Sequence, residues 1–227
     1  MIDLFTHEEW QAIRLSLVVA AYAVAMGLPV AIIVSMLLRW PKMPGRTVLN
    51  IVAHLPLVLP PVVVGWLLLV TFGIRGPVGS FLNEWFGIRL VFTATGAALA
   101  CAVMSFPLMV RAIKLSLDAV DSGLEDAAST LGAKSLDRFF TITLPLMAPG
   151  VVSGAITAYA SSLGEFGAVI TFASNVPGQT QTLPLAIFSA LQTPGGEEAA
   201  ARLSAVSVTL AVAGLLLGEW VGKRLRA

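Results

Sequence analysis

Five long apolar stretches constrain this chain more than any other feature of its sequence. They cover residues 11–38, 48–73, 90–110, 146–173 and 203–221. A helix of about 20 apolar residues crosses the roughly 30 Å hydrocarbon core of a bilayer, so each stretch can form one membrane span. Only 12% of the 227 residues are charged, whereas a soluble domain has about 25%. We therefore predict an all-α polytopic membrane protein, with a single domain over residues 1–227 and five transmembrane helices.

A shorter apolar segment, Leu183–Leu191, lies between the fourth and fifth stretches. It is too short to cross a bilayer as a helix. Turn-forming residues flank it, with Asn175–Gly178 before it and Thr193–Gly196 after it. We predict a short external or re-entrant helix here, which keeps the number of spans at five.

The distribution of Lys and Arg residues predicts how the spans are oriented. With five spans, ten of these residues fall on one side and four on the other. Cytoplasmic segments carry the excess of positive charge, so we expect the N-terminus outside the cell, and the C-terminus and residues 111–145 in the cytoplasm. A net charge of +1 argues against a nucleic-acid partner.

The loop 111–145 carries a helix signal within its charged sequence. Ser122 and Glu125 have the spacing of a capping box, in which each side chain bonds the other's backbone N–H. Gly132 stands where a helix C-terminus favours a residue that can take positive φ. We therefore predict a helix from about Gly123 to Leu131. Its apolar face is formed by residues at helical spacing, namely Leu124, Ala127, Ala128 and Leu131.

The same loop resembles the signature cytoplasmic loop of bacterial ABC-importer permeases. That signature is Glu-Ala-Ala, three residues, Gly, nine residues, Ile-x-Leu-Pro. This chain matches it everywhere except at the first position, where Asp126 replaces Glu and Glu125 comes one residue earlier. Which of the two carboxylates makes the polar contact of the family is left open. The resemblance assigns coupling to an ATPase to Glu125, Asp126, Ala127, Ala128, Leu131, Gly132, Ile142, Leu144 and Pro145.

The resemblance also implies a fold, partners and a location in the bacterial cytoplasmic (inner) membrane. It implies the type I ABC-importer permease fold, with a coupling helix that docks into a cleft on a separate ATPase subunit. The chain contains no G-x-x-x-x-G-K-[ST] phosphate loop, so we expect a transport subunit and not an enzyme. ATP would be bound by the partner, and we expect no catalytic residue, cofactor or metal in this chain.

Three further stretches resemble the permeases of molybdate ABC transporters, which are close to sulfate and thiosulfate permeases. They are residues 54–65, 105–112 and 162–168, the last followed by 172–178 and 193–196, and together with the loop they extend the resemblance over nearly the whole chain. The resemblance implies a homodimer that transports molybdate by alternating access, with two ATPase subunits below it. An external molybdate-binding protein would face residues 74–89 and 174–202. Tungstate, sulfate and thiosulfate remain alternative substrates.

Proline residues predict a break in the second stretch. Pro56, Pro60 and Pro61 each lack a backbone N–H, so the helix must kink or unwind there. Irregular backbone at membrane depth is tolerated only against protein or a water-filled cavity. We therefore place Pro60 and Pro61 beside the transport pathway. A kink that only improves packing is the alternative, and Pro107 should distort the third span less strongly.

Glu165 is an acidic residue in the interior of the fourth predicted span, and Gly164 and Gly167 flank it. A carboxylate at membrane depth costs at least about 2.5 kcal/mol, so a functional or paired role is expected. An oxyanion pathway would repel a direct carboxylate ligand. Glu165 is therefore either a structural bond or ion pair between subunits, or part of a gate. His54 is either a helix-end histidine or a contact for protons or anions.

The spans contain no cluster of Lys or Arg that would bind an oxyanion tightly. We expect a weakly binding path lined by hydroxyls, with candidates Ser105, Ser161, Ser162 and Thr171. These residues can equally pack helices together. Two other functional classes fit the sequence less well. A polytopic membrane enzyme needs several ionisable residues at one depth of the membrane, and the predicted spans do not contain such a set. A proton- or ion-coupled secondary transporter favours inverted repeats and paired charges within the spans, and the sequence contains neither of these.

Overall fold

The computed structural model describes residues 5–40 and 42–226, and all regular elements within them are helical, as the sequence predicts. In chain order these are α1 (His7–Arg39), α2 (Arg46–His54), η1 (Leu55–Leu57), α3 (Pro61–Phe72), α4 (Pro77–Phe86), α5 (Ala94–Asp118), α6 (Ser122–Thr130), α7 (Ser135–Arg138), η2 (Phe139–Thr143), α8 (Leu144–Leu163), α9 (Gly167–Ala173), α10 (Leu183–Leu191) and α11 (Glu197–Arg226).

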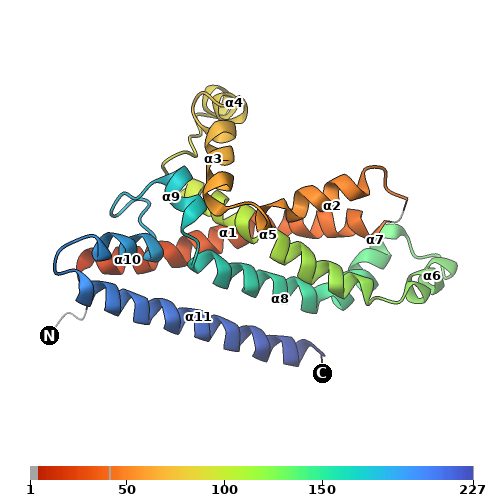
Figure 1. The fold of residues 1–227 in the computed structure, drawn as a ribbon. Coiled ribbons are helices and arrows are strands. Elements are labelled where there is room, and N and C mark those ends of the chain that lie inside the picture. Colours follow the sequence, from red (N-terminus) through yellow and green to blue (C-terminus); the bar gives the residue numbers. More distant parts are fainter. Residues whose placement is uncertain (1–4, 41, 227) are drawn as a thin grey trace.

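Within residues 5–40 and 42–226, four helices are long and apolar enough to cross a membrane. They are α1, α5, the helix that runs from α7 into α8, and α11. These helices lie side by side along one direction (Figure 1). Small residues let them approach closely, since Ala23, Ala97 and Cys101 are almost completely buried. At Gly154 of α8, an added Cβ would lie 3.3 Å from the Met109 Cα of α5.

The second apolar stretch is broken, as its prolines predict. α2 continues into the short 3-10 helix η1, and α3 begins at Pro61 after an extended residue, Pro60. The two halves are bent by 116°, so the structure has a fifth span only if this bent pair is counted as one. α3 and α4 together form an arm that stands away from the long helices (Figure 1). We call residues 61–86 the α3–α4 arm.

The fourth and third stretches differ from their predicted bounds. The apolar run 146–173 does not form one helix, because α8 ends at Leu163 and α9 begins at Gly167. Gly164 caps α8, and its N–H donates to the carbonyl oxygens of Ser161 and Ser162. α5 extends to Asp118, eight residues beyond the predicted end at 110, since nothing in 111–118 breaks a helix. Pro107 lies inside α5 without interrupting it.

The two ends of the bundle hold different elements. α6, α7 and the last turn of α11 lie at one end, where α1 also turns into α2 (Figure 1). The first turns of α1 and α11 lie at the other end together with α10 (Figure 1). The predicted short helix is found with its expected bounds, Leu183–Leu191. Its first N–H donates to the Ser16 hydroxyl of α1 over 2.6 Å, which fixes α10 against the bundle.

Candidate functional site

Helix α6 is capped at both ends, although its N-cap differs from the predicted one. The N-cap is Asp121, whose carboxylate accepts from the Gly123 N–H at 2.8 Å. The prediction of Ser122 as N-cap was wrong by one residue, because an aspartate is an equally good acceptor there. The helix ends as predicted, with Gly132 at φ +90°. The N–H groups of Gly132 and Ala133 donate to Ser129 and Ala128, which is a Schellman motif.

One face of α6 projects away from the rest of the protein. Leu124 is 49% exposed and Leu131, at the C-cap, is 88% exposed, and Ala127 is also exposed. A nine-residue helix is marginal in water without tertiary support. Two exposed leucines on such a helix therefore favour a partner surface that covers them.

The polar side of α6 adjoins the end of α1 and α7. Asp126 lines a cleft of about 270 Å³ together with Arg39 of α1 and Arg138 of α7. The Arg39 guanidinium also donates to the Val120 carbonyl oxygen over 3.4 Å, which ties α1 to the start of the loop. The side chain of Glu125 lies outside the described part of the structure, so its predicted contact stays a prediction.

The Ile-x-Leu-Pro end of the loop joins α6 to α8. Ile142 lies in η2, a π-helix in which the Leu144 N–H bonds the Phe139 carbonyl oxygen. Pro145 occupies the first turn of α8, where a missing backbone N–H costs little. The backbone is therefore helical without a break from Ser135 through η2 into α8, and the turn at residues 131–134 joins it to α6.

Two glycines bring α3 and α9 into close contact. A Cβ at Gly65 of α3 would lie 2.7 Å from the Thr171 Cβ and 2.8 Å from the Ala168 carbonyl oxygen. A Cβ at Gly167 of α9 would lie 2.8 Å from the Pro61 Cβ. Each helix thus has a glycine where the other passes. Pro61, Gly167 and Thr171, which were predicted separately, belong to this one crossing, whereas sequence reasoning missed Gly65.

Glu165 lies in the break between α8 and α9. Its carboxylate oxygen Oε1 accepts from the Ala168 N–H at 3.0 Å, and its own N–H donates to the Ser162 carbonyl oxygen. Glu165 is half-buried and holds the first turn of α9. This bond lies within the chain, so it does not test the predicted bond or ion pair between subunits. A role between subunits or in a gate stays a prediction.

The predicted lining hydroxyls lie in different surroundings. Ser105 is 1% exposed, and its hydroxyl donates to the Cys101 carbonyl oxygen of the same helix. Ser162 is also buried, whereas Ser161 is exposed and Thr171 is half-buried. Thr171 donates to the Gly167 carbonyl oxygen at 2.8 Å. A pathway role for these four side chains stays a prediction.

His54 makes a local contact within its own helix, whereas Glu9 makes a contact with a residue far away in the sequence. His54 ends α2, and its Nδ1 is 2.8 Å from the Asn50 carbonyl oxygen, which fits a helix-end histidine. Glu9 of α1 is buried and pairs with Arg202 of α11 at 2.9 Å. Sequence reasoning missed this ion pair, although Thr6 and Glu9 have the spacing of a capping box.

The long apolar helices, the broken pair and the exposed capped helix are the features of a membrane-embedded transport subunit. Residues 14–227 match the family described as "Binding-protein-dependent transport system inner membrane component", and the chain belongs to that family. It is 56% identical over 220 residues to a molybdenum transport system permease protein of Escherichia coli, with 97% of this chain and 96% of that protein covered. The corresponding Haemophilus influenzae protein is 52% identical over 218 residues, with 96% of this chain and 95% of that protein covered.

Solved structures support the fold. A bacterial ABC transporter involved in the import of the acidic polysaccharide alginate matches with a TM-score of 0.72 at 16% identity, covering 98% of this chain and 80% of that chain. The structure of the alginate transporter in complex with an alginate pentasaccharide-bound periplasmic protein also matches with a TM-score of 0.72 at 16% identity. It covers 95% of this chain and 77% of that chain. At this identity the likeness concerns the fold alone, which is that of ABC-importer permeases.

Proposed function

We propose that this chain forms the translocation pathway of an ATP-driven molybdate importer. The observation that carries the proposal is the exposed, capped α6 at the end of a bundle of long apolar helices. The substrate rests on the likeness to molybdenum transport permeases over nearly the full length of both chains. Alternating access would open the pathway first to the external binding protein and then to the cytoplasm.

Energy for transport would come from two ATPase subunits that bind α6. The chain has no phosphate loop of its own, so the nucleotide belongs to the partner. The flat face around Ala127 would enter a cleft on each ATPase subunit. Movement of that cleft would pass through η2 into α8, because the backbone is helical from Ser135 onward. The end of the bundle that holds α6 would then face the cytoplasm, with the N-terminus outside.

A homodimer would cover the apolar surface of the α3–α4 arm. Val62 and Trp66 on α3 are both 55% exposed, and Trp85 on α4 is 75% exposed. The arm packs on its own protomer through the Gly65 side of α3, which leaves these side chains for a second copy. Trp66→Cys should crosslink between subunits, since Cys101 is buried. Absence of a crosslinked dimer in the membrane would argue against this interface.

Uptake by reconstituted vesicles tests the function. Vesicles containing the permease and its ATPase should take up molybdate only with ATP inside and the cognate binding protein outside. Unlabelled molybdate and tungstate, which have similar size and charge, should compete, and sulfate should compete weakly. Equal competition by sulfate would shift the substrate to sulfate or thiosulfate. Uptake driven by an ion gradient without ATP would instead favour a secondary transporter.

A further inference from the structure

A polar hollow lies at the end of the bundle opposite α6. It has a volume of about 390 Å³ and is enclosed by the first turns of α1 and α11, α10, and the segment that precedes α10. These elements meet at the N-terminal end of α1 in Figure 1. We call this space the α10 hollow. Its polar lining includes Glu8, Glu9, Asn175, Gln181, Ser189 and Arg202.

Side-chain hydrogen bonds hold one wall of the α10 hollow in place. The Asn175 amide donates to the Ser189 hydroxyl at 2.8 Å. The Gln181 side-chain amide donates to the side-chain oxygen Oδ1 of Asn175 at 3.0 Å. These bonds link the segment before α10 to α10 itself, so the wall does not depend on a ligand for its shape.

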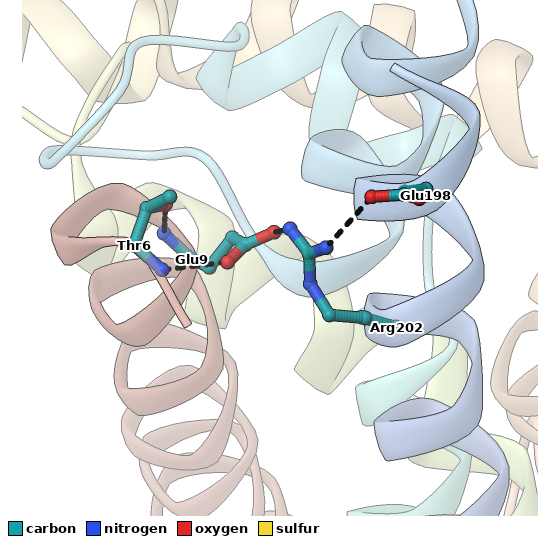
Figure 2. A network of polar contacts seen from close by, with 4 residues as sticks. All are labelled: Thr6, Glu9, Glu198 and Arg202. Carbon is teal, nitrogen blue, oxygen red and sulfur yellow. Dashed lines mark hydrogen bonds and ion pairs between the residues drawn. The ribbon is translucent and has the colours of Figure 1, made fainter. Parts of the chain in front are cut away.

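The opposite wall is ionic and is drawn in Figure 2. Glu9 is 6% exposed, accepts from the Thr6 N–H at 2.7 Å, and pairs with Arg202 at 2.9 Å. The other terminal nitrogen of Arg202 lies 3.8 Å from a carboxylate oxygen of Glu198. Arg202 therefore already binds two carboxylates. Glu8, which also lines the hollow, is exposed.

The charges of these walls exclude one class of ligand and favour another. Glu8 and Glu9 line the hollow together with the single guanidinium of Arg202. Glu198 does not line it but lies beside that guanidinium, and the four side chains carry a net charge of −2. A divalent oxyanion would be repelled, so the hollow is not a site for the transported anion. A metal ion is disfavoured as well, because the described residues contain no group of three potential His, Cys, Asp or Glu ligands.

We propose that the α10 hollow receives a basic side chain, Lys or Arg, from the external binding protein. The inference rests on the proposed function, which puts this end of the bundle outside the cell. Glu8 would pair with the incoming cation, while the Asn175 and Gln181 wall keeps the space open. Opposite charges on two partner surfaces steer their encounter and fix their register. The pair would thus align the binding protein over the permease.

Binding measurements on the assembled transporter test this role. The permease with its ATPase, in lipid nanodiscs, is titrated with the labelled cognate binding protein at low and high salt. Glu8→Lys should weaken binding about tenfold at low salt, because like charges then face each other. Glu197→Lys is the matched control, since Glu197 is equally exposed in the first turn of α11 but does not line the hollow; it should change binding by less than about twofold.

A filling variant tests the space independently of charge. Thr193→Trp places a large side chain at the rim of the hollow and should weaken binding at both salt concentrations. Equal effects of Glu8→Lys and Glu197→Lys, or unchanged binding in both Glu8→Lys and Thr193→Trp, would overturn the inference while leaving the proposed function intact. Failure of the unmodified transporter to bind any external binding protein would overturn both.

Discussion

The two parts of the candidate site hold their shape by opposite means. α6 is exposed, short and fixed by its caps, whereas the crossing of α3 and α9 is fixed by glycines that remove side chains from the contact. A capped helix can be covered by another protein without repacking its own core. A glycine crossing has no spare volume, so its helices can only move together or separate. The capped helix α6 therefore suits docking, and the glycine crossing of α3 and α9 suits a pathway element with discrete positions.

The largest effect is expected on the face of α6. Ala127→Arg together with Ala128→Arg should abolish ATP-dependent uptake, because two long charged side chains would prevent docking of the flat face. The amount of permease in the membrane should stay normal, since these residues contribute little to the core. Uptake and permease content are measured in the same vesicles. Uptake that persists would refute the docking role of α6.

The next largest effect is expected at Glu165, which lies between α8 and α9. Glu165→Gln should retain most transport, because the amide oxygen can still accept from the Ala168 N–H. Glu165→Lys should lose most of it, because an ammonium group has no acceptor and lies at a helix N-terminus. The measurement is the initial rate of uptake by vesicles that contain each variant. Equal loss in the two would show that a negative charge is required.

The glycine crossing should respond to a single methyl group. Gly65→Ala forces its Cβ against backbone and side-chain atoms of α9, and overpacking of this kind costs about 1–3 kcal/mol. The thermal midpoint of the purified permease in detergent should therefore fall. Gly222→Ala serves as the control, since nothing lies within 4 Å of a Cβ there. Similar midpoints for both variants would contradict tight packing of α3 on α9.

The smallest effect is expected at the start of α6. Asp121→Ala removes the acceptor for the Gly123 N–H, and loss of an N-cap costs about 1 kcal/mol. The free loop should exchange its α6 amide hydrogens faster. Ser122→Ala should not have this effect if Asp121 is the cap. Bound ATPase should restore protection in both variants, and a lasting difference in the bound state would mean that docking does not stabilise the helix.

The sequence predicts those features that depend on local chemistry. Gly132, the prolines around Pro60 and the bounds of α10 follow from backbone conformations that neighbouring residues determine. The break after Leu163 was missed, because the apolar run continues through it and Glu165 bonds only its own next turn. Gly65 was missed for another reason, since its role exists only when α9 lies against α3. The Glu9–Arg202 pair likewise joins residues 193 positions apart.

The π-helix η2 has a consequence for the register of the whole coupling region. Its Leu144-to-Phe139 bond encloses one residue more than an α-helical turn. Because a π turn and an α-helical turn both close about one full circle, the wide turn takes up one extra residue while the segment before it keeps nearly the direction of an unbroken α-helix. A one-residue insertion elsewhere in α8, where no turn is widened, would instead rotate everything before it by about 100°. Such an insertion should therefore be more harmful to coupling than a one-residue deletion between Phe139 and Thr143.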